Sequence, residues 1–170
     1  MKPLFQHFGI SCFSRTPDIM LMWSHYTRSH SGFCLEFDVK ALNECAQSED
    51  KINWVEVDYV EQVPEYSIFK APKYSEIVGK KSKDWEYESE VRALRLPTNY
   101  HFPAEVITGI IFGLNGINQP EDSPAKKYIE ELKSYLNKDF THLQDSIFLA
   151  KKDISTYKIN IERLSWEFLY

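Results

Sequence analysis

Hydrophobic residues recur with helical spacing shortly after the start of the chain. The stripe at positions i, i+3, i+4 and i+7 consists of Ile19, Met22, Trp23 and Tyr26. This spacing places one apolar face toward a core. Thr16 and Pro17 suit the N-cap and the first position of a helix, and Gly32 suits its end. The pattern predicts a helix from Thr16 toward Gly32, with Tyr26 on its buried face against a strand over 33–37.

Runs of β-branched and aromatic residues predict strands along the rest of the chain. These strands cover 9–14, 33–38, 51–60, 85–96, 106–113, 146–150 and 157–164. Helices are predicted over 39–48, over 72–84 and from Ser123 onward. The last of them has the stripe Tyr128, Ile129, Leu132, Tyr135 and Leu136. Because strands outnumber helices without regular alternation, we expect an α+β fold with a mainly antiparallel, split sheet and helices packed on it.

The segment 85–96 carries the most chemistry of any predicted strand. Alternation places four charged side chains on one face, namely Glu86, Glu88, Glu90 and Arg92. Two acids that share a site can divide the work of base and acid, since repulsion raises the pKa of one of them. The same pattern also describes an ion pair on a solvated strand face, which contributes about 0 to 1 kcal/mol. The residues alone leave both interpretations open.

The helix stripe contains a second group of candidates. Tyr26 and His25 diverge by about 100° on a helix, so only one of them can face the core. His25 can hydrogen-bond a ligand or be solvated, and Trp23 and Tyr26 can simply pack. His25 and His30 are five residues apart, which is not the i, i+4 spacing of a helical zinc pair, so we expect no metal site.

The composition of the chain bears on its number of domains, its binding partners and its cellular compartment. The 170 residues, 43% of them hydrophobic, fit a single domain over 1–170 with a core at about 9–164. A net charge of -5 argues against nonspecific nucleic-acid binding. The odd set Cys12, Cys34 and Cys45 predicts buried thiols in a reducing, cytoplasmic compartment. No apolar run is long enough to span a membrane, so we expect no membrane contact.

Familiar catalytic templates do not occur in the sequence. It has no GxGxxG, no Walker A loop and no GxSxG elbow. The segment 113–116 resembles a phosphate loop only faintly, and a plain turn is the simpler interpretation.

The ordered set of motifs resembles a bacterial family, domain of unknown function 2971. The residues that carry the resemblance are Ser11-Cys12-Phe13-Ser14, Met22-Trp23-Ser24-His25-Tyr26, 30–38, Tyr59 with Pro64, Lys83, Trp85-x-Tyr87-Glu88-x-Glu90-x-Arg92, 107–113 and 148–150. Family members usually carry an upstream segment ending in an Asn-Asp-Pro-like motif, so this chain looks like an N-terminally short member.

More distantly, a Tyr-bearing helix followed by a strand with spaced glutamates is similar to ADP-ribosyltransferase-like folds. That analogy implies NAD as a substrate without a metal, with Glu90 or Glu88 as the catalytic acid beside Arg92. Tyr26 would stack on nicotinamide, flanked by His25 and Trp23. The acceptor would be a small molecule or a protein, and the setting toxin-like or phage defence.

Two other interpretations stay open beside this analogy. One is a non-catalytic binding or regulatory module with a degenerate pocket, such as a defence-associated partner protein. The other is a structural domain whose acidic strand is only a solvated face. In the enzyme interpretation, the N-terminal His or Arg that grips the adenosine ribose has no obvious counterpart in this sequence, unless His7 takes that role.

Overall fold

The computed structural model describes residues 9–46, 51–66, 69, 72–95, 102–117, 120 and 124–165. The chain divides into two compact units, each built from two separate stretches. Unit 1 comprises residues 1–16 and 46–100, and unit 2 comprises residues 17–45 and 101–170. The α+β class with split, mostly antiparallel sheets is confirmed. The expectation of a single domain stays a prediction.

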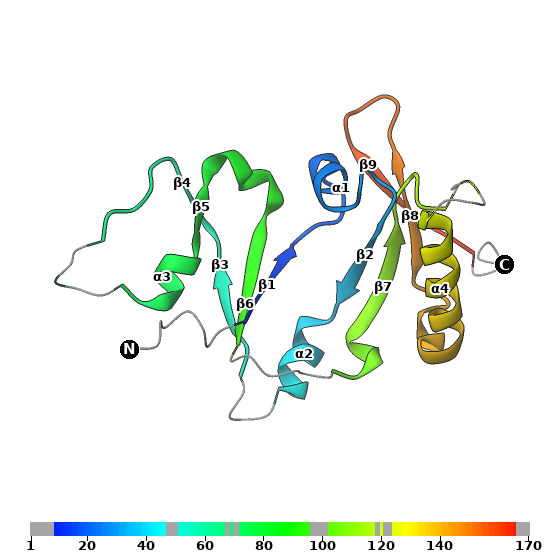
Figure 1. Cartoon of the computed structure of the whole chain (residues 1–170), viewed down its shortest axis with the longest axis horizontal. Helices are drawn as coiled ribbons and strands as arrows, with labels where there is room; N and C mark the ends of the chain where they lie inside the picture. The colour runs from blue at the N-terminus through cyan, green and yellow to red at the C-terminus, as the bar shows by residue number, and fades with distance from the viewer. Residues whose placement is uncertain are drawn as a thin grey trace. The chain divides into compact units, whose positions relative to one another are not determined.

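Unit 1 is organised around a central strand. This strand, β6 (Glu90–Arg95), lies between β1 (Gly9–Ser14) and β3 (Asn53–Glu56) and is antiparallel to both (Figure 1). The described residues of this unit also form a small parallel pair, β4 (Asp58–Val60) and β5 (Lys80–Ser82). Its helical elements are α3 (Tyr74–Val78) and the 3₁₀ helix η2 (Lys83–Glu88).

Unit 2 contains a four-stranded sheet. Its strand order is β2 (Phe33–Phe37), β7 (Ile107–Phe112), β8 (Ile147–Lys152) and β9 (Ile159–Arg163). The β7–β8 pair is parallel and the other two pairs are antiparallel. The helices of this unit are α1 (Met20–Tyr26), α2 (Val39–Cys45), η3 (Ala104–Val106), α4 (Pro124–Asp139) and η4 (Thr141–Leu143).

Hydrophobic side chains pack on both faces of the unit 2 sheet. On one face, α4 and η4 cover a cluster of buried residues, Ile107, Ile110, Phe112, Ile129, Leu136, Leu143 and Ile147. On the other face, Trp23 of α1 packs with Ile111, Ala150 and Ile159. A strand buried on both faces needs a nearly continuous apolar run, and β7 has one.

Several sequence predictions are confirmed by these elements. The strands β1, β2, β7, β8 and β9 lie within or close to the predicted ranges. The predicted helix over 39–48 is present as α2, and its first turn is capped by Asp38. The Asp38 carboxylate accepts the backbone N–H groups of Lys40 and Ala41 at 2.8 and 3.1 Å.

The first helix differs from its prediction at both ends. It begins at Met20 rather than Thr16, and residues 16–19 are not helical. The Trp23 indole N–H donates to the Pro17 carbonyl at 2.6 Å, which holds this carbonyl outside a helical hydrogen bond. It ends at Tyr26, before a turn in which Arg28, Ser29 and His30 all have positive φ. The burial predicted for Tyr26 is wrong, since the residue is 62% exposed.

Other predicted ranges are also wrong in part. The helix over 72–84 is restricted to Tyr74–Val78, because Gly79 ends it and the chain continues as β5. The strand over 51–60 is divided between β3 and β4. In α4, Ile129 and Leu136 are buried as expected, but Tyr128 and Tyr135 are exposed. Of the five predicted stripe residues, Leu132 is partly buried against the same cluster, so only part of the stripe faces the core.

Candidate functional site

The predicted site residues lie in two different places. Glu88, Glu90 and Arg92 belong to unit 1, whereas Trp23, His25 and Tyr26 belong to unit 2. The structure brings the first three together: Lys81 binds both Glu88 and Glu90, and Arg92 binds Glu90. That the two groups converge on one cavity stays a prediction.

The segment that carries the glutamates is not one long strand. Residues 83–88 form η2, and Ser89 follows in the left-handed region with φ 47° and ψ 51°. Only Glu90 onward is strand, so the predicted ladder of Glu86, Glu88, Glu90 and Arg92 on one strand face is wrong. A strand cannot pass through a left-handed residue without breaking its alternation.

Hydrogen bonds hold this reversal of the chain in place. The Ser14 hydroxyl donates to the Glu88 carbonyl at 2.8 Å, and the Arg15 N–H donates to the Ser89 carbonyl at 3.1 Å. Ser14 is the last residue of β1, which pairs with β6, and Arg15 follows it directly. A non-glycine residue in the left-handed region costs about 1 to 3 kcal/mol and persists only where its surroundings fix it.

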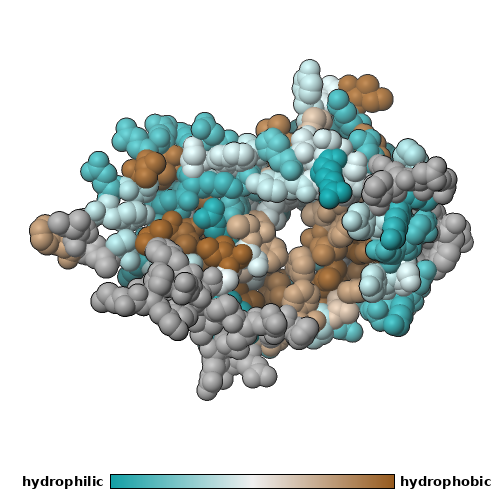
Figure 2. All heavy atoms as spheres, in the orientation of Figure 1, coloured by the Kyte–Doolittle hydropathy of each residue, from teal (hydrophilic) through white to brown (hydrophobic). Residues whose placement is uncertain are grey.

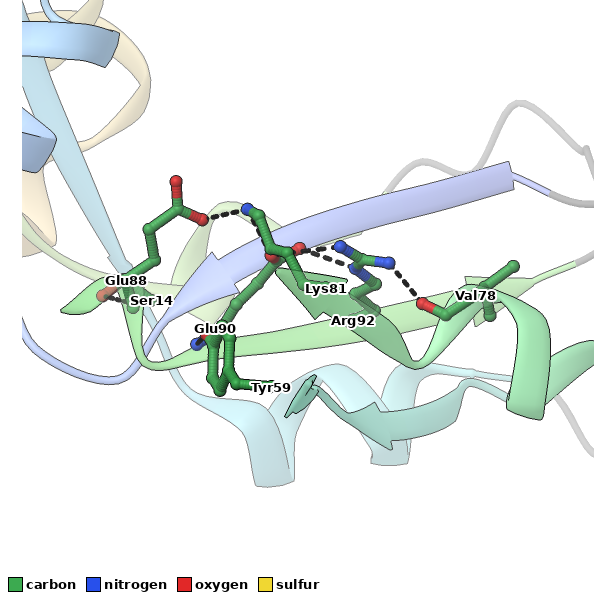
Figure 3. A network of polar contacts seen from close by, with 7 residues as sticks. All are labelled: Ser14, Tyr59, Val78, Lys81, Glu88, Glu90 and Arg92. Atoms are coloured by element: carbon green, nitrogen blue, oxygen red, sulfur yellow. Dashed lines mark hydrogen bonds and ion pairs between the residues drawn. The ribbon is translucent and has the colours of Figure 1, made fainter. Parts of the chain in front are cut away.

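Four charged side chains form a compact network, which we call the charged cluster: Lys81, Glu88, Glu90 and Arg92 (Figure 3). The Lys81 ammonium binds the Glu88 carboxylate and donates to Glu90 Oε2 at 2.8 Å. Arg92 donates from Nε to Glu90 Oε1 at 2.7 Å and from a terminal nitrogen to Glu90 Oε2 at 3.2 Å. Both carboxylate oxygens of Glu90 are therefore occupied.

The cluster is also tied to its surroundings. Arg92 donates to the backbone carbonyl of Val78 at the end of α3. The Glu90 N–H donates to the Tyr59 hydroxyl at 2.8 Å, which connects the start of β6 to β4. The Lys81 ammonium lies 5.3 Å from the centroid of the Trp85 ring, within the range of a cation–π interaction. The cluster thus joins α3, β4, β5, η2 and β6.

Burial makes these contacts strong. Glu88 and Glu90 are 3% and 5% exposed. Burial by itself raises the pKa of Glu90, but hydrogen bonds from Arg92, Cys12 and Lys81 outweigh it and lower the pKa to about 2. For Lys81 burial acts to lower the pKa, and the bonds to Glu88 and Glu90 prevail and raise it. Glu90 and Lys81 are therefore both ionised at neutral pH.

Cys12 lies beside the cluster, directly across from Arg92 in the β1–β6 register. The prediction that the cysteines are buried is wrong for this residue, which is exposed on an edge strand. Loss of water around the sulfur and then the Glu90 carboxylate raise the pKa of the Cys12 thiol. A raised pKa leaves little thiolate at neutral pH, so Cys12 does not have the properties of a nucleophile.

Three members of this site were not identified as site residues from the sequence: Lys81, Tyr59 and Cys12. Lys81 falls in a lysine-rich stretch predicted to be helical, and its role depends on the pairing of β5 with β4. Tyr59 contacts the cluster through its hydrogen bond with Glu90, and Cys12 lies beside it through the pairing of β1 with β6. Both contacts join residues that are tens of positions apart in the sequence. Tyr59 and Cys12 did belong to the motifs that carry the family resemblance, which was the only signal in the sequence.

The second group surrounds α1. Trp23 is 2% exposed, and its ring stacks on His30 with centroids 6.5 Å apart and an interplanar angle of 8°. His30 Nε2 lies 3.2 Å from the Ser24 hydroxyl. Burial, followed by the charge of Lys152, lowers the pKa of His30, so the imidazole is neutral. Trp23 is a core residue here, whereas His25 and Tyr26 are exposed.

Neither a metal centre nor a membrane span is indicated by the described ranges. Within 9–46, 51–66, 69, 72–95, 102–117, 120 and 124–165, no group of three His, Cys, Asp or Glu residues is placed to hold a metal ion. No helix in the same residues is long and apolar enough to cross a bilayer.

Comparison with known proteins gives one match. Residues 22–93 match a family model described as a protein of unknown function, DUF2971. The matched range contains the Trp23–Tyr26 motif and all four residues of the charged cluster. The family predicted from the motifs is therefore confirmed over this part of the chain. No curated protein and no solved structure matches the chain.

Proposed function

We propose that this chain, a member of the DUF2971 family over residues 22–93, is a non-catalytic binding module in which the charged cluster fixes the shape of η2 and β6. One observation carries the proposal. Both carboxylate oxygens of Glu90 accept hydrogen bonds from Arg92 and Lys81 in a buried setting. A carboxylate engaged in this way is part of the scaffold.

The charge balance of the cluster supports this role. Two carboxylates contribute -2 and Lys81 and Arg92 contribute +2, so the formal sum is zero. A carboxylate stabilises a developing oxocarbenium ion less when cations already compensate its charge. With a pKa of about 2, Glu90 is also far from the range in which a general acid or base exchanges protons near neutral pH. Burial of the two carboxylates in ion pairs with Lys81 and Arg92 favours a structural role for these residues.

The surface that the cluster supports is aromatic. Trp85 is 38% exposed on η2, and its ring lies 5.9 Å from that of Tyr87. Aromatic side chains are enriched among the residues that contribute most to binding interfaces. We infer that η2 is the surface that meets a partner. We further propose that the module has a regulatory role in the bacterial cytoplasm, in a defence system. The three free cysteines fit a reducing compartment.

A second candidate function is an ADP-ribosyltransferase-like use of NAD. It is favoured by one feature, the buried pair Glu88 and Glu90, of which Glu90 is ionised at neutral pH. In this mechanism the bond between the ribosyl carbon and the nicotinamide nitrogen breaks, and nicotinamide leaves with the electron pair. An acceptor on a small molecule or protein then bonds to that carbon and loses its proton to water.

The residues of the NAD hypothesis have defined roles. Glu90 or Glu88 would stabilise the positive charge on the ribosyl ring while Arg92 orients the carboxylate. Tyr26 would stack on nicotinamide, with His25 and Trp23 beside it, and no metal takes part. His7, the candidate for the adenosine ribose, lies outside the described residues.

One experiment separates the two functions. Isothermal calorimetry and nicotinamide release are measured with NAD on the chain, on Glu90→Gln and on Tyr26→Ala. Glu86→Gln is the matched control, since Glu86 is an exposed carboxylate of the same 3₁₀ helix. We expect no release by any of the four proteins. Release that falls at least about tenfold in Glu90→Gln but not in Glu86→Gln would overturn the module proposal and establish the NAD hypothesis.

A further inference from the structure

The loop between β8 and β9 presents two large apolar side chains to solvent. Ile154 is fully exposed and Tyr157 is 90% exposed. We call residues 153–158 the hairpin tip. The tip extends away from the sheet of unit 2 (Figure 1), and apolar atoms protrude from the surface at this end of the hairpin (Figure 2).

The tip has a fixed shape. The Asp153 N–H donates to the Lys158 carbonyl at 2.9 Å and closes the loop. One oxygen of the Asp153 carboxylate accepts the backbone N–H groups of Ser155 and Thr156 and also the Ser155 hydroxyl. These bonds lower the pKa of Asp153 to about 2, so the carboxylate stays ionised and the loop keeps its geometry at neutral pH. Ile154 and Tyr157 are exposed on a loop that is already ordered.

The charged residues at this end of the hairpin carry a small net positive charge. Lys151, Lys152 and Lys158 flank the tip and are all exposed. Asp153 and Glu162, which binds Lys151 at 2.5 Å, offset two of the three positive charges. The sum of +3 and -2 leaves the hairpin end at +1, in a chain whose net charge is -5. The sign of the charge at the tip is therefore opposite to that of the whole protein.

We propose that the hairpin tip is a docking site for an anionic lipid surface. Ile154 and Tyr157 insert at the boundary between headgroups and acyl chains, while the lysines contact the lipid phosphates. The apolar side chains of the tip thus match the acyl-chain region of the bilayer, and its lysines match the phosphate groups. A hairpin docks from one side and needs no spanning helix.

The size of the tip favours a bilayer over a protein partner. A stable protein interface buries about 800 Å² on each partner and needs an apolar centre wide enough to exclude water. The tip offers two protruding apolar side chains, separated in the sequence by Ser155 and Thr156. A bilayer accepts single protruding side chains because it deforms around them.

Vesicle sedimentation tests the proposal on the full chain. Binding is measured to vesicles of phosphatidylcholine alone and to vesicles with phosphatidylglycerol added, and Ile154→Asp is the test variant. Val63→Asp is the matched control, because Val63 is also 90% exposed but lies near Glu61 and Glu65. We expect binding only to the anionic vesicles. Ile154→Asp should weaken it at least about tenfold, with no change in Val63→Asp.

The lysines are tested in the same assay. The double variant Lys152→Glu with Lys158→Glu should lose binding, and added salt should weaken binding by the unaltered chain. Equal binding to neutral and anionic vesicles, equal losses in Ile154→Asp and Val63→Asp, or no binding to either vesicle would overturn the proposal. The last outcome would leave an acidic protein partner as the alternative.

Discussion

Glu90 links the stability of unit 1 to pH. Its folded pKa of about 2 lies below the ordinary 4.5, so its contribution is fully present above pH 4.5 and is lost as pH falls toward 2. The difference corresponds to roughly 3 kcal/mol at neutral pH. We expect Glu90→Gln to reduce the free energy of unfolding by a similar amount at pH 7 and to flatten its pH dependence in this window.

Urea unfolding at pH values between 7 and 2.5 measures this effect. Glu86→Gln serves as the control, because Glu86 is exposed on η2 and should follow the unaltered chain. If Glu90→Gln kept the full acid dependence of the unaltered chain, Glu90 would not be the group whose ionisation stabilises the cluster.

Cys12 reports on the charge of Glu90 from outside the cluster. Partial loss of water around its sulfur and then the Glu90 carboxylate raise the thiol pKa, so alkylation should be slow at pH 7.5. Replacing Glu90 by Gln removes the negative charge and should increase the rate with iodoacetamide several-fold. The measurement uses a background in which Cys34 and Cys45 are Ser. An unchanged or slower rate would contradict the contact between the two side chains.

The residues of the cluster were only partly predictable. Glu90 and Arg92 follow from alternation along one strand, because a local period of two decides which side chains share a face. Glu88 joins them by a different route, through the left-handed Ser89 and a shared bond to Lys81. Nothing local in a lysine-rich stretch marks Lys81 as a partner, since its position depends on strands that pair across the sequence.

At the scale of elements, the turn after α1 depends on a glycine far away in sequence. Arg28, Ser29 and His30 have φ of 49°, 56° and 66°, and the loop after β7 holds them in place. The Asn115 N–H donates to the His30 carbonyl at 2.8 Å. A Cβ at Gly113 would lie 2.3 Å from the same carbonyl oxygen, which is backbone and cannot rotate away.

We therefore expect Gly113→Ala to destabilise the protein by about 1 to 3 kcal/mol through overpacking. Gly9→Ala is the control, because a Cβ there would meet its nearest neighbour at an ordinary 3.8 Å. Thermal unfolding followed by circular dichroism compares the two variants. Equal midpoints would show that the turn can shift away from Gly113 without cost.

Elements with a simple environment were predicted well. The apolar, β-branched run of β7 was predicted as a strand, and α2 lies within the helix predicted over 39–48. The limits of α1 were not predictable. At its start, the Trp23 indole N–H donates to the carbonyl of Pro17, and after its end Arg28, Ser29 and His30 adopt left-handed conformations. Tyr26 fits the helical period but is the last residue of α1 and is exposed.

At the scale of the molecule, apolar burial is distributed unevenly. In the part of the chain that the structure describes, the buried hydrophobic side chains of unit 1 are Val78 and Leu94, and all the others belong to unit 2. The buried side chains of unit 1 also include Glu88 and Glu90. Composition predicts the total amount of core but not its division, since both units take residues from two separate stretches.

This division predicts how the two units open. Local opening is easiest where few apolar groups are buried, so amides of β6 should exchange hydrogen faster than amides of β7. Unit 1 relies on ion pairs that weaken as Glu90 is protonated, whereas β7 packs between two apolar clusters. Hydrogen-exchange mass spectrometry on peptides covering 90–95 and 107–112 measures the difference. Glu90→Gln should accelerate exchange in β6 alone, and Leu136→Ala should do so in β7. Equal protection of both strands, or one response shared by both variants, would show that the two units open together.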